Sequence, residues 1–319
     1  SIGLGYRVPL VIASPWSRGG FVNSEVFDHT SSLQFLEEFL SKKTGRKIRE
    51  TNISDWRRTI CGNLGSVFRP YQQEKIETPA FLSRDEVLVS IKQAEFKKLP
   101  SDYKLLSPEL IEQMEKDLYG SPVMPQQEKG IRPSCALPYE LYADGKLSAD
   151  KKSFNIRFGA GNEVFGKAAC GSPFSVYAPG KYKSADQNEI YEAVRTWAYG
   201  VKAGDQVEDQ WPVESFENDQ YHLRVYGPNG FFREFKGGIT DPLLEVSCEY
   251  ESRPGAKNIL TGNIQLVLRN LHDQAYSLEI TDNAYKAPVI RKTLPKKGAG
   301  PAGSIVLLDL SKNHGWYDF

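Results

Sequence analysis

The sequence predicts a mainly β protein, with two tandem β-sandwich domains preceded by a partial α/β segment and a helical linker. Three observations predict this class. A near-continuous apolar run at residues 6–13 precedes a helical pattern, as at the end of an α/β sheet. From Ala136 onward, apolar and polar residues alternate between turns rich in Gly, Pro and Asn. This alternating pattern occurs twice, at an offset of about 100 residues, the size of one β-sandwich.

The composition argues against two functional classes. The 319 residues carry 40 Lys+Arg and 40 Asp+Glu, so no net charge attracts nucleic acid, and none is expected as a partner. No apolar run is long enough to span a bilayer. The four cysteines, Cys61, Cys135, Cys170 and Cys248, have no C-x-x-C spacing, which argues against a zinc site. Their even number permits disulfides, but buried free thiols are the favoured interpretation.

Residues 1–50 are predicted to be the C-terminal end of an α/β domain. The apolar run at 6–13 is typical of a strand buried on both faces of a parallel sheet, although Pro9 favours an edge position or an irregular start. A lone strand is unstable without partner strands and a covering layer. Because Ser1 is not a methionine and no strand pattern precedes the run, we expect a larger domain upstream.

A helix is expected to follow this strand. It should begin near Asp28 or Thr30 and end at Gly45, a residue suited to a helix C-cap. Its apolar face is formed by Leu33, Leu36, Phe39 and Leu40.

Residues 51–134 are predicted to form a helical wrapping segment and a linker. The Trp-Arg-Arg string at 56–58 is expected to fix this segment against the α/β part of the chain. Amphipathic patterns predict helices at 84–98 and 108–118. The stretch at 121–134 is rich in proline and polar residues and is therefore predicted to be a linker.

Two β-sandwich repeats are predicted at residues 135–239 and 240–319. The matching strings are 137–143 with 241–250, 154–162 with 263–271, 173–182 with 275–286, and 219–227 with 313–319. A hairpin turn is predicted at 226–231 in the first repeat. The second repeat has no matching hairpin before Phe319, so we predict that it is C-terminally incomplete.

Several strings resemble one family. They are GLGYRVPLVIASPWSRGGFVNSEVFDHTSSLQFLEEF at 3–39, ISDWRRTICGNLGSVF at 53–68, MPQQEKGIRPSCALPYEL at 124–141 and the tandem β repeats. Together they resemble the bacterial phosphocholine-preferring phospholipases C. In that family an alkaline-phosphatase-like phosphoesterase domain is followed by two small C-terminal β domains. The resemblance covers essentially the whole chain, and the SPWSRGG and FDHTS motifs are specific in combination.

The resemblance implies a parent enzyme that hydrolyses phosphatidylcholine or sphingomyelin to phosphocholine and diacylglycerol or ceramide. It also implies a divalent metal in the intact parent, a phospholipid or membrane surface as partner, and a secreted or periplasmic location. In this family the hydroxyl nucleophile and most metal ligands precede the strand that matches residues 5–9. We therefore expect the chain alone to bind no metal and to be inactive.

The sequence itself offers no replacement for those missing groups. It holds no H-E-x-x-H or G-x-S-x-G motif. The four histidines, His29, His222, His272 and His314, lie far apart in the sequence.

Asp28 and His29 are the candidate catalytic residues. The connection from strand to helix is expected at the carboxyl edge of the sheet, where open α/β folds bind ligands. A helix N-terminus there favours phosphate, and His29 could donate a proton to a phosphoryl oxygen or a leaving group. The structural alternative is that Asp28 caps the helix and His29 packs behind it.

Trp16 and Arg18 are the candidate substrate-binding residues. The Trp16 ring could hold a choline trimethylammonium group by cation–π attraction, and the Arg18 guanidinium could bind phosphate. The structural alternatives are a buried core position for Trp16 and a surface ion pair between Arg18 and Glu25.

Two further interpretations of the chain stay open. The β repeats could be a non-catalytic binding module for a lipid surface, a glycan or a partner protein. Kinship with acid phosphatases or sulfatases would explain the N-terminal segment in outline, but the tandem β repeats argue against it. The sequence does not predict an oligomeric state.

Overall fold

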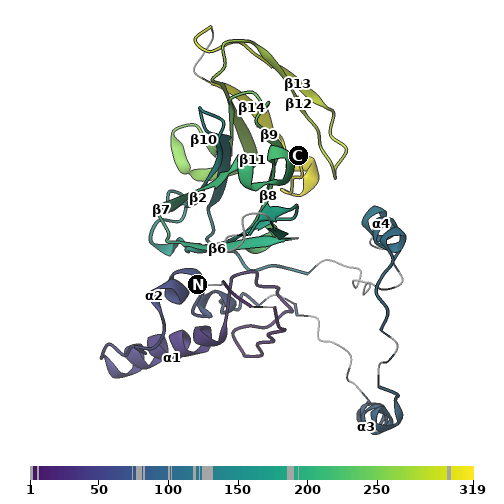
Figure 1. The fold of residues 1–319 in the computed structure, drawn as a ribbon. Helices are drawn as coiled ribbons and strands as arrows, with labels where there is room; N and C mark the ends of the chain where they lie inside the picture. The colour runs from purple at the N-terminus through teal and green to yellow at the C-terminus, as the bar shows by residue number, and fades with distance from the viewer. Residues whose placement is uncertain are drawn as a thin grey trace. The chain divides into compact units, whose positions relative to one another are not determined.

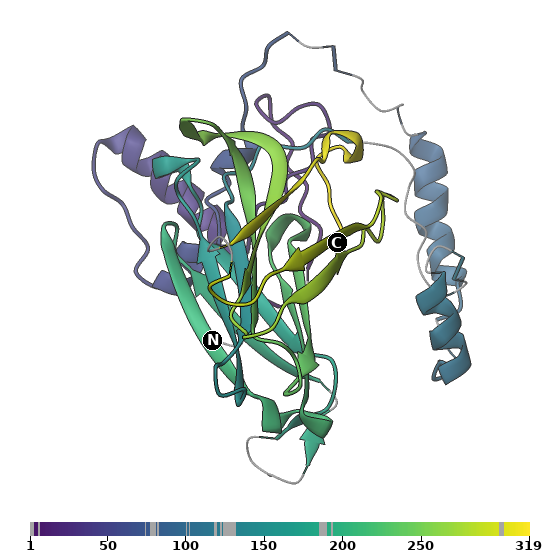
Figure 2. The ribbon, with the colours of Figure 1, turned by 90° about the horizontal axis from the view of Figure 1, so that it is seen from above.

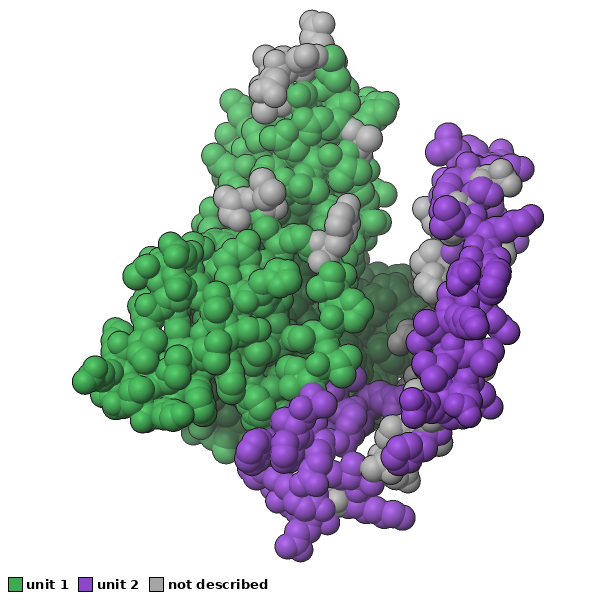
Figure 3. Space-filling view, turned by 90° about the horizontal axis from the view of Figure 1, so that it is seen from below, with its two compact units in different colours: residues 1–12, 23–68, 135–319 green, residues 13–22, 69–134 purple. Residues whose placement is uncertain are grey.

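The computed structural model divides the chain into two compact units. Unit 1 comprises residues 1–12, 23–68 and 135–319, and unit 2 comprises residues 13–22 and 69–134 (Figure 3). The residues that the structure describes are 3–5, 7–73, 75–76, 81, 83–99, 101, 103–117, 120–121, 123, 132–184, 190–192, 194–299 and 303–319. Among them, no helix is both long and apolar enough to cross a membrane.

Unit 1 begins with a helical part. It contains α1 (His29–Thr44), α2 (Asp55–Ile60) and the 3-10 turn η1 (Gly65–Val67) (Figure 1). Asp28 is the N-cap of α1, and Gly45 ends the helix in the left-handed conformation, at a φ of 66°. The predicted start and end of this helix are therefore confirmed.

The strand predicted at 6–13 is not formed. Residues 7–13 have no strand conformation, and the side chains of Val8, Leu10 and Val11 are exposed. The run pairs with none of the described strands, and an apolar sequence cannot hold a strand in place without a neighbouring backbone to pair with.

Unit 2 contains α3 (Arg84–Gln93), the 3-10 turn η2 (Ala94–Phe96) and α4 (Pro108–Lys116). Serine side chains at 83 and 107 cap α3 and α4. Both predicted helices are confirmed, with earlier ends than expected. Most of the predicted linker at 121–134 lies outside the described residues; at its end, the Val22 backbone N–H donates to the Pro133 carbonyl at 2.9 Å.

The first β repeat consists of two antiparallel sheets and a short separate pair of strands. Its strands are β1 (Leu141–Leu147), β2 (Ser153–Ala160), β3 (Ser172–Ala178), β4 (Tyr182–Lys183), β5 (Tyr191–Glu192), β6 (Arg195–Val201), β7 (Asp205–Pro212), β8 (Gln220–Tyr226) and β9 (Phe232–Gly238). One sheet has the order β1-β2-β7 and the other β6-β3-β8-β9, with β4 and β5 paired separately. The predicted hairpin is confirmed: Tyr226 pairs with Phe232 across the turn η6 (Pro228–Gly230).

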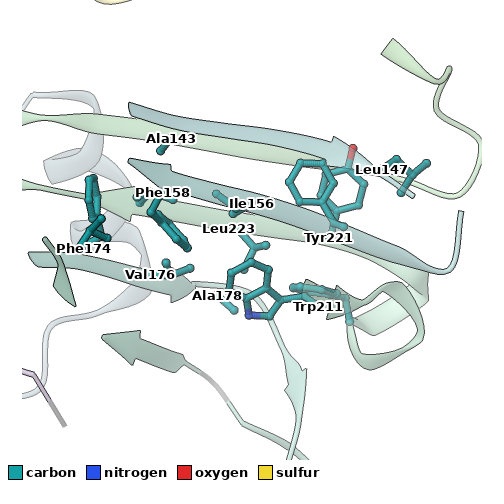
Figure 4. Packing of buried hydrophobic residues seen from close by; sticks show 14 of the residues in the cluster. Ala143, Leu147, Ile156, Phe158, Phe174, Val176, Ala178, Trp211, Tyr221 and Leu223 are labelled. Carbon is teal, nitrogen blue, oxygen red and sulfur yellow. The ribbon is translucent and has the colours of Figure 1, made fainter. Parts of the chain in front are cut away.

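The core of this repeat lies between its two sheets (Figure 4). Alternate residues of β2, such as Ile156 and Phe158, are fully buried, which is the period-two pattern read from the sequence. The Phe158 ring lies 5.5 Å from the Phe174 ring of the other sheet. Trp211 is also buried, with its ring 5.6 Å from that of Trp197. The repeat is a β-sandwich, as predicted.

The second repeat repeats this plan with fewer strands. It contains β10 (Leu244–Arg253), β11 (Ala256–Asn270), β12 (Tyr276–Ile280), β13 (Ile290–Leu294) and β14 (Ser304–Leu308). The sheet β10-β11-β14 corresponds to β1-β2-β7, and the pair β12-β13 faces it across a small core. The string at 313–319 does not form a counterpart of β8. A left-handed turn at His314 and Gly315, with φ of 55° and 79°, follows η7 (Ser311–Asn313) and is incompatible with an extended strand.

The two repeats meet along β1 and β10, which lie side by side in opposite directions (Figures 1 and 2). The Tyr250 hydroxyl donates to the Leu141 carbonyl and accepts from the Leu141 backbone N–H, both at 3.3 Å. Further along, the Lys146 ammonium pairs with the Glu245 carboxylate at 3.1 Å. The outward faces of β1 and β10 are thereby held next to each other.

The helical part of unit 1 packs on the first repeat through α2. Helix α2 contacts β6 and β3, and a Cβ atom added at Gly200 of β6 would lie 2.7 Å from the indole nitrogen of Trp56. Only a glycine permits this approach. In addition, the Val26 backbone N–H donates to the Tyr139 hydroxyl at 3.1 Å. Residues 23–68 are therefore fixed to the sandwich.

Candidate functional site

The carboxylate of Asp28 holds the start of α1. It accepts hydrogen bonds from the Thr30 backbone N–H at 2.8 Å and from the Thr30 hydroxyl at 2.6 Å. It also forms an ion pair with the Arg57 guanidinium of α2. The capping alternative for Asp28 is thus observed, and a catalytic role for it stays a prediction.

Electrostatics at this helix start keep Asp28 ionised. Burial favours the neutral carboxyl, but the hydrogen bonds from Thr30 and Arg57 outweigh it, so the pKa of Asp28 lies below its ordinary value. Cys61 lies beside it, and burial together with the Asp28 charge raises the pKa of the Cys61 thiol to about 12. Cys61 is therefore a protonated thiol at neutral pH and a poor nucleophile. All four cysteines are free thiols, as predicted, but only Cys61 is buried; the other three are partly exposed.

His29 is the first residue of α1 and its side chain is exposed. It does not pack behind Asp28, so the structural alternative for His29 does not hold. Within the described part of the chain, no hydrogen bond fixes its imidazole, which is free to meet a ligand at the helix N-terminus.

A second ion pair joins α1 to α2. The Arg58 guanidinium donates two hydrogen bonds to the Glu37 carboxylate, both at 2.8 Å, and a third to the Glu50 carbonyl at 2.6 Å. The hydrogen bonds from Arg58 lower the pKa of Glu37 to about 2. Arg57 and Arg58 thus fix the wrapping segment to α1, which is the role predicted for the Trp-Arg-Arg string.

Trp16 and Arg18 lie together on a loop of unit 2. Trp16 is 64% exposed, so it is not a buried core residue. Arg18 donates from Nε to the Pro15 carbonyl at 3.0 Å, and its guanidinium lies 4.4 Å from the centre of the Tyr71 ring. Glu25, the ion-pair partner considered for Arg18, accepts a hydrogen bond from the Ser66 hydroxyl. Tyr71 was not predictable from the sequence, because a lone tyrosine in a polar stretch belongs to no periodic pattern.

No metal site can be built from the side chains that the structure describes. Among them, no group of three or more His, Cys, Asp or Glu residues could hold a metal ion. Asp28 already has Thr30 and Arg57 as partners. These residues do not fit a divalent metal, and we derive no chemical step through one.

Comparisons with family models match the N-terminal segment and the first β repeat. Residues 1–41 match the family model "Phosphoesterase family", and residues 133–238 match "Bacterial phospholipase C, C-terminal domain". The chain is 31% identical to a non-hemolytic phospholipase C of Pseudomonas aeruginosa, over 99% of this chain and 40% of that protein. It is 34% identical to the hemolytic phospholipase C of the same organism, over 99% of this chain and 41% of that protein.

A non-hemolytic phospholipase C of Burkholderia pseudomallei is 32% identical, over 99% of this chain and 39% of that protein. The chain belongs to the bacterial phospholipase C family. It spans about 40% of the length of these relatives. All four candidate site residues of the chain lie within residues 1–41, which match the phosphoesterase model.

The Glu37–Arg58 pair predicts a pH dependence of stability. Because the folded-state pKa of Glu37 is depressed to about 2, the stabilisation is present above the ordinary glutamate pKa of about 4.3 and is lost as the pH falls toward 2. Glu37→Gln should lower the free energy of unfolding by roughly 1 kcal/mol at neutral pH, allowing for solvent screening, and by nothing near pH 2.

Urea unfolding followed by circular dichroism at several pH values measures this difference. Glu112→Gln, which removes an exposed ion pair with Lys116 in α4, is the matched control and should change little at any pH. A Glu37→Gln deficit that did not shrink in acid would contradict the assignment.

Proposed function

We propose that this chain is the C-terminal part of a phospholipase C that hydrolyses phosphatidylcholine or sphingomyelin to phosphocholine and diacylglycerol or ceramide. The matches at residues 1–41 and 133–238, together with the phospholipase C relatives, support the proposal. Phosphoesterase kinship suggests a metal-dependent parent. We assign the nucleophile and the divalent metal to the part of the phosphoesterase domain that residues 1–41 do not represent.

The observation that carries this proposal is the exposed apolar surface of residues 1–41. The side chains concerned are Val8, Leu10, Val11, Leu33, Leu36, Phe39 and Leu40. Burial of each such side chain is worth roughly 1.5–3 kcal/mol, so the exposure of all of them to water is unfavourable. We propose that the rest of the phosphoesterase domain covers this surface in the intact enzyme, with the 7–12 segment as a strand of its sheet.

Within that enzyme each candidate residue would have its own role toward the substrate. The exposed Trp16 ring suits the trimethylammonium of choline, and Arg18 suits a phosphate oxygen. His29 at the helix N-terminus would donate a proton to a phosphoryl oxygen or to the leaving alkoxide. The lipid substrate makes a phospholipid surface the expected partner, and we propose a secreted or periplasmic location.

A chimera tests the covering of α1. In it, this chain replaces the matching 40% of the non-hemolytic phospholipase C of Pseudomonas aeruginosa. The chimera should release phosphocholine from phosphatidylcholine vesicles, whereas this chain alone should release none. Leu36→Lys should lower the release at least about tenfold, because burying an unpaired ammonium costs several kcal/mol.

The matched control is Ile305→Lys, since Ile305 is exposed on β14 of the second repeat. It should leave phosphocholine release unchanged. Equal effects of the two lysine substitutions, or brisk turnover by the unfused chain, would refute the proposal.

The same chimera tests His29. His29→Ala should lower kcat at least about tenfold with little change in KM, because general acid catalysis contributes about 10²–10⁴-fold to turnover. Initial rates on a soluble short-chain phosphatidylcholine measure the effect without vesicle binding. His314→Asn, at an exposed turn where asparagine tolerates the left-handed backbone, is the control. Unchanged kcat for His29→Ala would remove this residue from the site.

A further inference from the structure

A large groove crosses the junction of the two β repeats. Its volume is about 1030 Å³, and residues of β1, β2, β7, β10 and β11 line it. Many of these residues lie on the face of the sheets opposite to the cores. In β1, for example, Tyr142 and Asp144 line the groove, whereas Leu141 and Ala143 are buried in the sandwich. The groove is thus the outer face of the two sheets that β1 and β10 bring together.

The lining is polar and nearly balanced in charge, with seven acidic and five basic side chains. Several of these charges neutralise one another: Arg157 pairs with Asp144 at 3.5 Å, and Lys146 and Arg269 pair with Glu245 at 3.1 and 3.8 Å. Such a surface does not suit a lipid acyl chain, which requires apolar walls. It equally lacks the strong positive potential that a polyanion requires.

One aromatic ring on the groove floor, that of Tyr142, lies over a glycine of the neighbouring strand. Tyr142 pairs in register with Gly159 of β2, and a Cβ atom at Gly159 would lie 3.5 Å from the Tyr142 side chain. The Tyr250 ring meets the Tyr142 ring edge-on, and the two ring centroids are 5.5 Å apart. A glycine inside a strand costs stability and often marks the close approach of a ligand.

The position of the Tyr142 ring is fixed by the hydrogen bond of its hydroxyl group. Its hydroxyl donates to the Glu140 carboxylate at 3.0 Å, and Glu140 also accepts from the Val164 backbone N–H at 3.1 Å. Glu140 is buried, so its carboxylate holds the Tyr142 hydroxyl in a fixed position. The ring is therefore preorganised, which lowers the entropy cost of binding a ligand to it.

We propose that this groove binds an extended, uncharged oligosaccharide, with one sugar ring stacked on Tyr142. A pyranose ring has C–H groups on its face, which suit an aromatic ring, and hydroxyls at its edge, which suit carboxylate and amide side chains. Amides at Asn155, Gln206 and Gln265 lie among the lining carboxylates. Five strands at a spacing of about 4.8 Å span roughly 20 Å, enough for several sugar units.

This proposal is independent of phosphodiester hydrolysis. The groove lies wholly within residues 140–269, outside the range that matches the phosphoesterase model. A chain that bound saccharides and failed in the chimera would separate the two proposals, as would the reverse result.

The test uses the full chain. A printed array of neutral oligosaccharides of three or more units identifies the best ligand, and isothermal titration calorimetry with that oligosaccharide gives the dissociation constant. We expect a Kd below about 1 mM. Phosphocholine and phosphatidylcholine vesicles are titrated in parallel and should not compete with the saccharide.

Two variants locate the binding. Tyr142→Ala removes the ring, and Gly159→Val places a branched side chain where the ring now lies and so displaces it; each should weaken binding at least about tenfold. Tyr177→Ala, at an exposed tyrosine on β3 that does not line the groove, is the control and should bind normally. The proposal is overturned if no saccharide binds below about 1 mM, if phosphocholine displaces it, or if Gly159→Val binds as the parent chain does.

Discussion

The contact between β1 and β10 is the constraint on which the C-terminal architecture depends. Among the described residues, the core of the second repeat contains seven buried apolar side chains, against seventeen in the first. A core of that size is marginal for an independent domain. Edge pairing with the first repeat supplies what is missing, because the Tyr250 hydroxyl satisfies both backbone groups of Leu141 at an otherwise open sheet edge. A buried carboxyl strengthens the seam: the Cys248 backbone N–H donates to Asp144.

Unit 1 also carries α1, which lies within the residues that match the phosphoesterase model apart from its last three. Helix α2 packs on β6, and two arginines of α2 hold α1 by its N-cap and by Glu37. The apolar face of α1 is thereby presented outward by a fixed support rather than by a loose helix. Under the proposed function, this arrangement lets the β module hold α1 in position for the rest of the phosphoesterase domain.

The sequence predicted those features that depend on local chemistry. Asp28 and Gly45 are cap residues in almost any context, and the alternating pattern around Phe158 requires a strand with one buried face. Features that depend on distant partners were not predictable. The apolar run at 6–13 has the pattern of a strand, but among the described residues no strand pairs with it; Trp16 has the character of a core residue but is exposed. Apolar residues indicate that burial is favourable without indicating which surface provides it. The groove was not predictable from the sequence either. Its lining comes from two repeats, and the pattern of apolar and polar residues does not determine how the two repeats align.

The most direct test of this account is amide hydrogen exchange of the full chain and of Tyr250→Phe, followed strand by strand. If the repeats form one body through the β1–β10 contact, the slowest amides of β2 and β11 open with the same free energy. The substitution, which removes only the hydroxyl, should then lower both values together by about 0.5–1.5 kcal/mol. Amides of β11 that open several kcal/mol more easily than those of β2, with neither strand affected by Tyr250→Phe, would contradict the account.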